Sequence, residues 1–184
     1  MRQEHAPQAK AAIARAAVQL LRNGHVIFLD GGTTTLQVAQ YLPRTLHATI
    51  ITNSPPIALA LAEHAYVDVY LIGGQLFKSS LITVGAAAIA EVQMTRADVC
   101  LVGVCSLHPE HGLSVPDREE AYLKRLMITN AAETMALVSA EKLGTLAPYI
   151  VAPLRDITGI VTDASVPTET LTPYRAHGIM IIQP

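Results

Sequence analysis

The sequence predicts an α/β protein with a mostly parallel sheet flanked by helices. Short apolar, β-branched runs alternate with segments of helical periodicity. The runs are continuous in Val, Ile and Leu, which indicates strands buried on both faces, as in a parallel sheet covered by helices. In addition, five successive runs end in small or polar residues, as strands do where their loops form a binding edge.

The first half of the chain repeats a strand-loop-helix unit. Apolar positions at helical spacing over 8–22 predict an amphipathic helix, which the pair Asn23-Gly24 ends. The remaining elements are strands at 25–29, 48–51 and 67–72 and helices at 34–42 and 57–63. The 57–63 helix follows two prolines, which suit the first turn because its N–H groups have no partner within the helix.

The second half continues the alternation with longer connections. Residues 76–84 are less regular, and residues 107–117, with two His, two Pro and a Gly, are predicted to form a loop of functional length. The predicted elements are helices at 85–92 and 118–132, strands at 97–102, 134–139, 157–162 and 179–182, and a helix between 166 and 177.

Length and composition favour a single folded domain over 1–184. The chain has 184 residues, of which 51% are hydrophobic, enough for a substantial core. The longest apolar runs are far too short to span a membrane, and the N-terminus lacks the layout of a signal peptide, so no membrane partner and a cytoplasmic location are expected. Cys100 and Cys105 are too few for a disulfide framework, and no zinc-binding spacing is present.

The charge balance argues against direct nucleic-acid binding. Thirteen Lys and Arg against fifteen Asp and Glu give a net charge of −2, and no basic cluster interrupts the sequence. Aromatic residues make up 4% of the chain and Trp is absent, so stacking platforms for single strands are not expected.

Five strand ends predict one binding edge, because parallel strands present their carboxyl ends on the same side of a sheet. These ends read DGGTTT, TNSPP, GGQ, GVCS and SAEK. Glycines allow a close backbone approach, and the N–H groups of the helix after DGGTTT favour an anion. The polar side chains expected there are Asp30, Thr33, Thr34, Thr35, Thr52, Asn53, Ser54, Gln75, Lys78, Ser79, Ser80, Ser106, Glu119, Glu120 and Lys124.

This mixture of hydroxyls, amides, acids and cations suits a polyhydroxylated anion such as a sugar phosphate. Neither GxGxxG nor GxxxxGK[ST] occurs, so neither a dinucleotide fingerprint nor a P-loop is predicted, and no cofactor is expected.

Structural alternatives remain open for several of these residues. Thr33 alone can cap the helix that follows it. Glu120 and Lys124 are four apart, as in an ordinary exposed ion pair worth about 0.3–0.5 kcal/mol. Asn53 and Ser54 can simply shape the turn before Pro55, and Glu141 with Lys142 can mark a helix entry. His108 and His111 lack a third ligand at a recognisable spacing, so no metal site is predicted.

A set of motifs in fixed order resembles the C-terminal effector domain of DeoR-type bacterial transcription regulators. The motifs are LDGGTTT, ITNSPPIA, LIGGQL with LITVG, GLSVPDREEAYLKRLMI and VSAEKLG, and they span about residues 8–163. The resemblance implies a Rossmann-like fold related to ribose-5-phosphate isomerase and glucosamine-6-phosphate deaminase. It also implies a phosphorylated sugar or related metabolite as effector, which alters DNA binding by a separate N-terminal winged helix-turn-helix. The sequence begins where the family's linker ends, so DNA is expected as a partner only through that absent domain.

Carried over by position, the family's ligand loops add glycines and one cysteine to the candidate site. The resulting ligand-binding set is Asp30, Gly31, Gly32, Thr33, Thr34, Thr35, Thr52, Asn53, Ser54, Gly73, Gly74, Gln75, Lys78, Cys105, Ser106, Glu119, Glu120 and Lys124. One departure concerns the end of the fourth strand. Family members commonly have Gly-Ala-Asp-Gly there, whereas this chain has Gly103-Val104-Cys105-Ser106 and so lacks an acid.

The resulting prediction is a non-catalytic sensor that forms a homo-oligomer. The alternative is a sugar-phosphate isomerase or deaminase with Glu119 or Glu120 as general base and Lys124 stabilising an enolate. Cys105 in place of the acid argues against catalysis. A pure oligomerisation domain would fit the apolar composition but would leave the polar loops unexplained.

Overall fold

The structure is a computed structural model that describes residues 7–184. Residues 1–6, the start of the predicted 1–184 domain, lie outside the described residues. The helices are α1 (Pro7–Val18), α2 (Thr33–Tyr41), α3 (Pro55–Leu61), α4 (Ala86–Gln93), α5 (Arg118–Thr129) and α6 (Thr168–Arg175). The strands are β1 (Val26–Leu29), β2 (Ala48–Thr52), β3 (Val67–Leu71), β4 (Gln75–Phe77), β5 (Ile82–Val84), β6 (Ala97–Gly103), β7 (Ser106–His108), β8 (Gly112–Val115), β9 (Ala131–Leu137), β10 (Tyr149–Ala152), β11 (Gly159–Val161) and β12 (Met180–Ile182).

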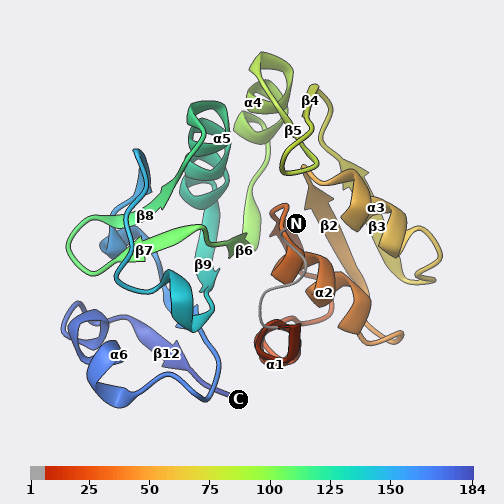
Figure 1. Cartoon of the computed structure of the whole chain (residues 1–184). Helices are drawn as coiled ribbons and strands as arrows, with labels where there is room; N and C mark the ends of the chain where they lie inside the picture. Colours follow the sequence, from red (N-terminus) through yellow and green to blue (C-terminus); the bar gives the residue numbers. More distant parts are fainter. Residues whose placement is uncertain (1–6) are drawn as a thin grey trace.

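Seven strands form one sheet, in the order β12-β11-β9-β6-β1-β2-β3, and all neighbours are parallel. Ile27 of β1 lies opposite Ile50 of β2 and Val99 of β6. The chain runs outward from β1 to β3 and then returns to β6 on the other side of β1 (Figure 1). The strand order therefore reverses between β1 and β6, which is where open α/β sheets bind ligands. The predicted fold class is confirmed.

Helices cover both faces of this sheet and enclose two apolar cores. Ile27 and Leu29 of β1 pack in the core with α1, α2 and α3, whereas Phe28 packs in the core with α4, α5 and α6. Figure 1 shows α1 and α2 on one side of the sheet and α4 and α5 on the other. Burial on both faces explains why these strands are continuous apolar runs. None of the helices in residues 7–184 is both long and apolar enough to cross a membrane.

Two small sheets lie outside the main one, and they overturn part of the sequence-based assignment. Residues 107–117 are not a loop, because β7 and β8 form an antiparallel hairpin that β10 extends. Residues 76–84 contain most of a second hairpin, β4–β5. These strands have three or four residues each, too few to show a periodicity. The partner β10, which the sequence analysis missed, lies more than thirty residues beyond β8.

The border between α5 and β9 also differs from the prediction. The helix ends at Thr129 rather than 132, and Ala131 pairs with Ala97 in the main sheet. Asn130 separates the two elements, and its side chain donates to the Val92 carbonyl oxygen at 2.7 Å. The helix was predicted too long because alanine favours helices, whereas pairing with β6 places Ala131 in a strand.

The C-terminal helix α6 is attached to the small hairpin through a tyrosine. The Tyr174 hydroxyl donates to the Leu107 carbonyl oxygen at 2.7 Å and accepts from the Gly144 N–H at 2.8 Å. The Tyr174 side chain is buried, and burial raises its pKa. Tyr174 thus joins α6 to β7 and to Gly144, which follows the 3₁₀ segment Ala140–Lys142.

Candidate functional site

The turn after β1 brings backbone unusually close to the β4–β5 hairpin. A Cβ atom on Gly31 would overlap Cγ2 of Ile82, so the close approach requires glycine here. The Gly31 N–H donates to Oδ1 of Asn53 at 2.9 Å, which fixes the turn from the end of β2. The loop after β2 therefore holds the loop after β1 in place through this hydrogen bond.

Helix α2 begins in this turn without a side-chain cap. Its N-cap is Gly32, and Thr33 is the first helical residue, so the alternative that Thr33 caps the helix is wrong. The Leu36 N–H donates to the Gly32 carbonyl oxygen at 2.9 Å, at the start of the helix. The N–H groups of the first turn have no partner within a helix, and they give its N-terminus a partial positive charge.

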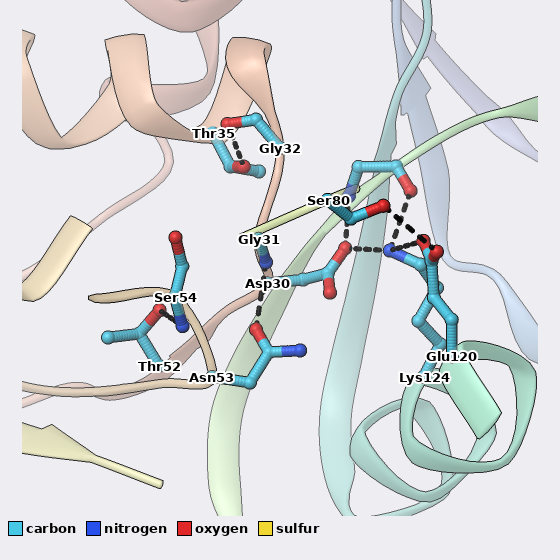
Figure 2. Close-up of polar contacts among 11 residues, drawn as sticks. Asp30, Gly31, Gly32, Thr35, Thr52, Asn53, Ser54, Ser80, Glu120 and Lys124 are labelled. Atoms are coloured by element: carbon cyan, nitrogen blue, oxygen red, sulfur yellow. Dashed lines mark hydrogen bonds and ion pairs between the residues drawn. The ribbon is translucent and has the colours of Figure 1, made fainter. Parts of the chain in front are cut away.

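A buried lysine connects three segments at the switch point between β1 and β6. The Lys124 ammonium pairs with Oδ2 of Asp30, lies 3.4 Å from Oε1 of Glu120 and donates to the Gly103 carbonyl oxygen at 3.3 Å. The Gly103 N–H in turn donates to Oδ2 of Asp30 at 3.0 Å. Figure 2 shows Asp30, Glu120 and Lys124 meeting, with Ser80 of the β4–β5 turn beside them. The Ser80 hydroxyl donates to Oε2 of Glu120 at 3.5 Å.

Helix α5 presents the acid and the lysine from one face. Asp117 is its N-cap and accepts from the Glu120 N–H at 2.9 Å, so the helix starts at a fixed point. Glu120 and Lys124, four residues apart, are 3% and 1% exposed. The alternative of an ordinary exposed ion pair is therefore wrong: spacing alone does not say which face of a helix is buried.

Burial and charge act in opposite directions on the two partners. Burial raises the pKa of Asp30 and outweighs the Lys124 ammonium, which lowers it, so this pKa lies above its ordinary value. Burial also lowers the pKa of Lys124, but the negative charges of Asp30 and Glu120 outweigh it and hold that pKa above its ordinary value. The lysine is thus firmly protonated and carries a positive charge that two acids share.

A cavity of about 430 Å³ opens beside these groups. Its lining includes three lysines and two glutamates, a formal charge of +1. The carboxylate of Asp30, which lies beneath the lining and pairs with Lys124, offsets this charge. The cavity is lined by Lys10, Gly31, Gly32, Thr33, Thr34, Gly103, Val104, Cys105, Glu120, Lys124, Glu141 and Lys142.

The predicted ligand residues fall into three groups around this cavity. Seven of them line it: Gly31, Gly32, Thr33, Thr34, Cys105, Glu120 and Lys124. Others lie beneath or beside the turn as support. Asp30 holds Lys124, the Thr35 hydroxyl donates to the Gly32 carbonyl oxygen at 3.1 Å, and Thr52 accepts from the Ser54 N–H at 3.1 Å.

The third group lies away from the lining. Gln75 and Lys78 are exposed on the β4–β5 hairpin, and Gly74 before it is also exposed. The Gly73 N–H lies 3.3 Å from both carboxylate oxygens of Glu91, and Glu119 pairs with Arg118 at 3.9 Å. Ser106 is buried in β7. A ligand-binding role for any of these residues, or for the other two groups, stays a prediction.

Five lining residues were absent from the predicted set: Lys10, Gly103, Val104, Glu141 and Lys142. Glu141 and Lys142 belong to the strand end SAEK on the predicted binding edge, with a helix entry as the alternative, but they were not included in the ligand set. Lys10 had a signal in the sequence, because it shares the helical face of Ile13, Ala14 and Ala17, where every neighbour is apolar. A cation among the apolar positions of one helix face is an exception to the pattern that the sequence itself shows.

Two buried polar atoms of the supporting layer have no hydrogen-bond partner within residues 7–184: Oδ1 of Asp30 and Nδ2 of Asn53. Both belong to residues that are fully buried. Within the same residues, no group of three or more metal-ligating side chains comes together.

Solved structures with a similar fold include an isomerase and a translation initiation factor. Ribose 5-phosphate isomerase A from Methanocaldococcus jannaschii aligns with a TM-score of 0.55 and 17% identity, covering 74% of this chain and 54% of that one. The translation initiation factor eIF-2B from Pyrococcus horikoshii OT3 aligns with a TM-score of 0.60 and 18% identity, covering 85% and 62%. At these identities the likeness shows the fold alone.

Relatives in sequence are transcription regulators. The HTH-type transcriptional regulator GlpR of Haloferax volcanii is 33% identical over 175 residues, covering 95% of this chain and 68% of the relative. The HTH-type transcriptional repressor GlcR of Bacillus subtilis is 33% identical over 154 residues, covering 84% and 59%. The chain thus spans about 59–68% of these two relatives. The family model of the DeoR C-terminal sensor domain matches residues 5–164, and the chain therefore belongs to this family of sensor domains.

Proposed function

We propose that this domain binds a phosphorylated sugar or a related metabolite in the cavity between β1 and β6. Binding then changes how a helix-turn-helix domain elsewhere in the whole protein binds DNA. The observation that carries the proposal is that one cavity is lined both by an uncapped helix start and by Glu120 and Lys124, with Asp30 beneath them. The first suits a phosphate and the second suits hydroxyl groups.

The phosphate half of the ligand is assigned to the turn before α2. First-turn N–H groups and the helix dipole favour a dianion, and the cavity's lysines add charge-assisted hydrogen bonds. Gly32, Thr33 and Thr34 line the cavity at this point.

The sugar half is assigned to Glu120 and Lys124. A carboxylate accepts from hydroxyl groups and an ammonium donates to them, so the pair discriminates between polyols by orientation. The cavity volume of about 430 Å³ lies within the range of about 300–1,000 Å³ that is typical of small-molecule sites.

A panel of thermal shifts tests this proposal. Ribose 5-phosphate, glucose 6-phosphate and fructose 1-phosphate are compared with ribose, glucose and fructose. A ligand at 100 times its Kd stabilises by about 2.7 kcal/mol, which for a domain of this size raises Tm by about 5–10 °C. Shifts with the parent sugars and none with the phosphates at millimolar concentration would contradict the assignment of an anion to the α2 turn.

We further propose that the domain binds its ligand without turning it over. The relatives are named as transcription regulators, and the thiol of Cys105 lines the cavity where an acid was expected. Isomerase or deaminase activity through Glu120 and Lys124 is the second candidate, favoured by their contact at 3.4 Å. Incubating the best binder with the protein and following its proton NMR spectrum separates the two; turnover that Glu120→Gln abolishes establishes the enzyme.

A homo-oligomer in the cytoplasm completes the proposal. Strand β3 is the last strand at its end of the main sheet, and Tyr70 and Leu71 on it are exposed apolar side chains. Unpaired strand edges with apolar residues are surfaces on which copies associate. Light scattering coupled to size exclusion measures the assembly, and a Tyr70→Lys variant is expected to reduce it.

A further inference from the structure

Strand β3 pairs with β2 along one edge, and within residues 7–184 no strand pairs with its other edge. Even-numbered residues make the bonds to β2: the Tyr66 carbonyl oxygen accepts from the Ala48 N–H at 3.2 Å, and the Ile72 N–H donates to the Thr52 carbonyl oxygen at 2.8 Å. Successive residues of a strand direct their peptide groups to opposite edges. The residues whose N–H and C=O groups face the free edge are therefore Val67, Val69 and Leu71.

This edge is longer and less protected than the other sheet ends in the described part of the chain. Strand β3 has five residues, whereas the other strands at the end of a sheet have three or four. In β10, the carbonyl oxygens of Ile150 and Val151 already accept from the Arg125 guanidinium. Proteins commonly protect a free edge with proline or several charges, but β3 reads VDVYL and has one charge.

Exposed apolar side chains surround the free edge. Helix α3 packs against β3, and Figure 1 shows the two elements together at this end of the sheet. Large exposed apolar groups gathered on one part of a surface are typical of an interface with another protein. The side chains on α3, on β3 and just before β3 are Leu59, Tyr66, Tyr70 and Leu71.

The sequence of β3 fits an antiparallel copy of itself in one register. A two-fold axis through Asp68 would put two carboxylates directly opposite each other, which is unfavourable. An axis through Tyr70 would leave Val67 opposite a residue beyond the partner's strand. An axis through Val69 pairs all five residues and sets Asp68 opposite a tyrosine rather than a second acid.

We propose that two copies of this chain associate by antiparallel pairing of their β3 strands about Val69, which joins their two main sheets into one. The inference rests on the proposed homo-oligomer and specifies its interface. Outward N–H and C=O groups of the two strands then bond to each other. The two Tyr70 rings lie diagonally across the axis, within reach of each other. Strand β2 separates β3 from β1, so the ligand cavity between β1 and β6 is not part of this interface.

Disulfide cross-linking tests the register. Residues opposite each other in a pair without hydrogen bonds have Cα atoms about 4.5 Å apart, within the disulfide range of about 4.4–6.8 Å. A double variant with Asp68→Cys and Tyr70→Cys is therefore expected to form a covalent dimer on mild oxidation, seen on a non-reducing gel. Each single variant is the matched control, because its two cysteines are diagonal and about 7–8 Å apart. The wild type controls for Cys100 and Cys105.

Amide exchange followed by NMR tests the pairing on the wild type, which covers the case in which the cysteine variants fail to fold. The Val69 N–H faces solvent in a monomer and is bonded in the proposed dimer. At a concentration where light scattering gives the mass of a dimer or a larger oligomer, this amide is expected to exchange at least about 100-fold more slowly than that of the exposed Lys78.

Each contrary result overturns a stated part of the inference. A wild type that is monomeric at high concentration overturns the proposed homo-oligomer and this interface together. An oligomer in which Val69 exchanges as fast as Lys78 overturns the β3 pairing and leaves the homo-oligomer. Cross-linking of either single variant, or none of a folded double variant, overturns the register about Val69. None of these results bears on ligand binding in the cavity.

Discussion

Two groups of strand-end loops, alike in sequence, have different surroundings in the structure. The loops after β1 and β6 flank the switch point and line the cavity through Gly31, Gly32 and Cys105. The GGQ loop after β3 lies at the end of the sheet, and Gln75 and Lys78 beyond it are exposed. Convergence on one edge of a sheet therefore does not by itself bring a loop to the cavity; the loops that line it follow β1, β6 and β9, at or next to the reversal in strand order.

The largest expected difference between the two groups is in stability. Lys124→Met leaves the carboxylates of Asp30 and Glu120 buried without their counter-charge, which is expected to lower the free energy of unfolding by about 3–5 kcal/mol. Lys78→Met, on the exposed hairpin, is expected to change it by no more than about 0.5 kcal/mol. Urea denaturation measures both, and equal losses would erase the distinction between the two groups.

The same pair of variants predicts a difference at alkaline pH. The pKa of Lys124 is raised in the folded protein above its ordinary value of 10.5. The folded state then binds the proton more tightly than the unfolded state, so this stabilisation is complete below pH 10.5 and is lost as pH rises above it. The urea stability of the wild type should fall more steeply above pH 10.5 than that of Lys124→Met, because the variant lacks the ammonium that loses its proton. Parallel curves would contradict a charged, buried Lys124.

A smaller effect is expected from the turn itself. Gly31→Ala places a methyl group on Cγ2 of Ile82 and is expected to cost about 1–3 kcal/mol, as overpacking does. Gly32→Ala meets the Thr35 hydroxyl oxygen at 3.3 Å and is expected to cost less. Thermal unfolding of the two variants compares their losses of stability. A larger loss for Gly32→Ala would mean that the β4–β5 hairpin moves aside to accommodate the methyl group at position 31.

The hydrogen bond from the Gly31 N–H to Asn53 is expected to contribute about 1 kcal/mol to the free energy of unfolding. Asn53→Ala removes the acceptor for the Gly31 N–H, while it also removes the unpaired Nδ2, so the two contributions partly offset each other. Gln75→Ala, on an exposed side chain, serves as the control in chemical denaturation. A loss no larger than that of the control would make the Asn53–Gly31 bond dispensable.

The smallest expected effect is on ligand affinity. Gln75→Ala and Lys78→Met are expected to change the Kd for ribose 5-phosphate by less than about twofold, because neither residue lines the cavity. A large change in calorimetric titrations would show that the hairpin closes over the ligand and would return both residues to the site.

The main sheet was predictable because each of its strands carries its own apolar signal. The small sheet of β7, β8 and β10 was not, since three-residue strands such as Ser106–His108 have no periodicity and pair with a distant segment. For the site, the residue types that follow each strand pointed to the binding edge, but the sequence did not show which of those residues are buried. Glu120 and Lys124 have the spacing of a surface pair, and only the packing of α5 shows that they are enclosed. Lys10 went unnoticed because the helical pattern of 8–22 was interpreted as packing alone.

The hydroxyl of Tyr174 joins α6 to Leu107 and Gly144, yet the family model ends at residue 164. A chain cut after residue 164 would remove α6 and β12, leaving β11 without one of its two neighbours and the Leu107 carbonyl without its hydroxyl donor. The segment that defines the family in sequence is therefore shorter than the segment that completes the fold. Anyone preparing this domain in isolation should keep residues 165–184.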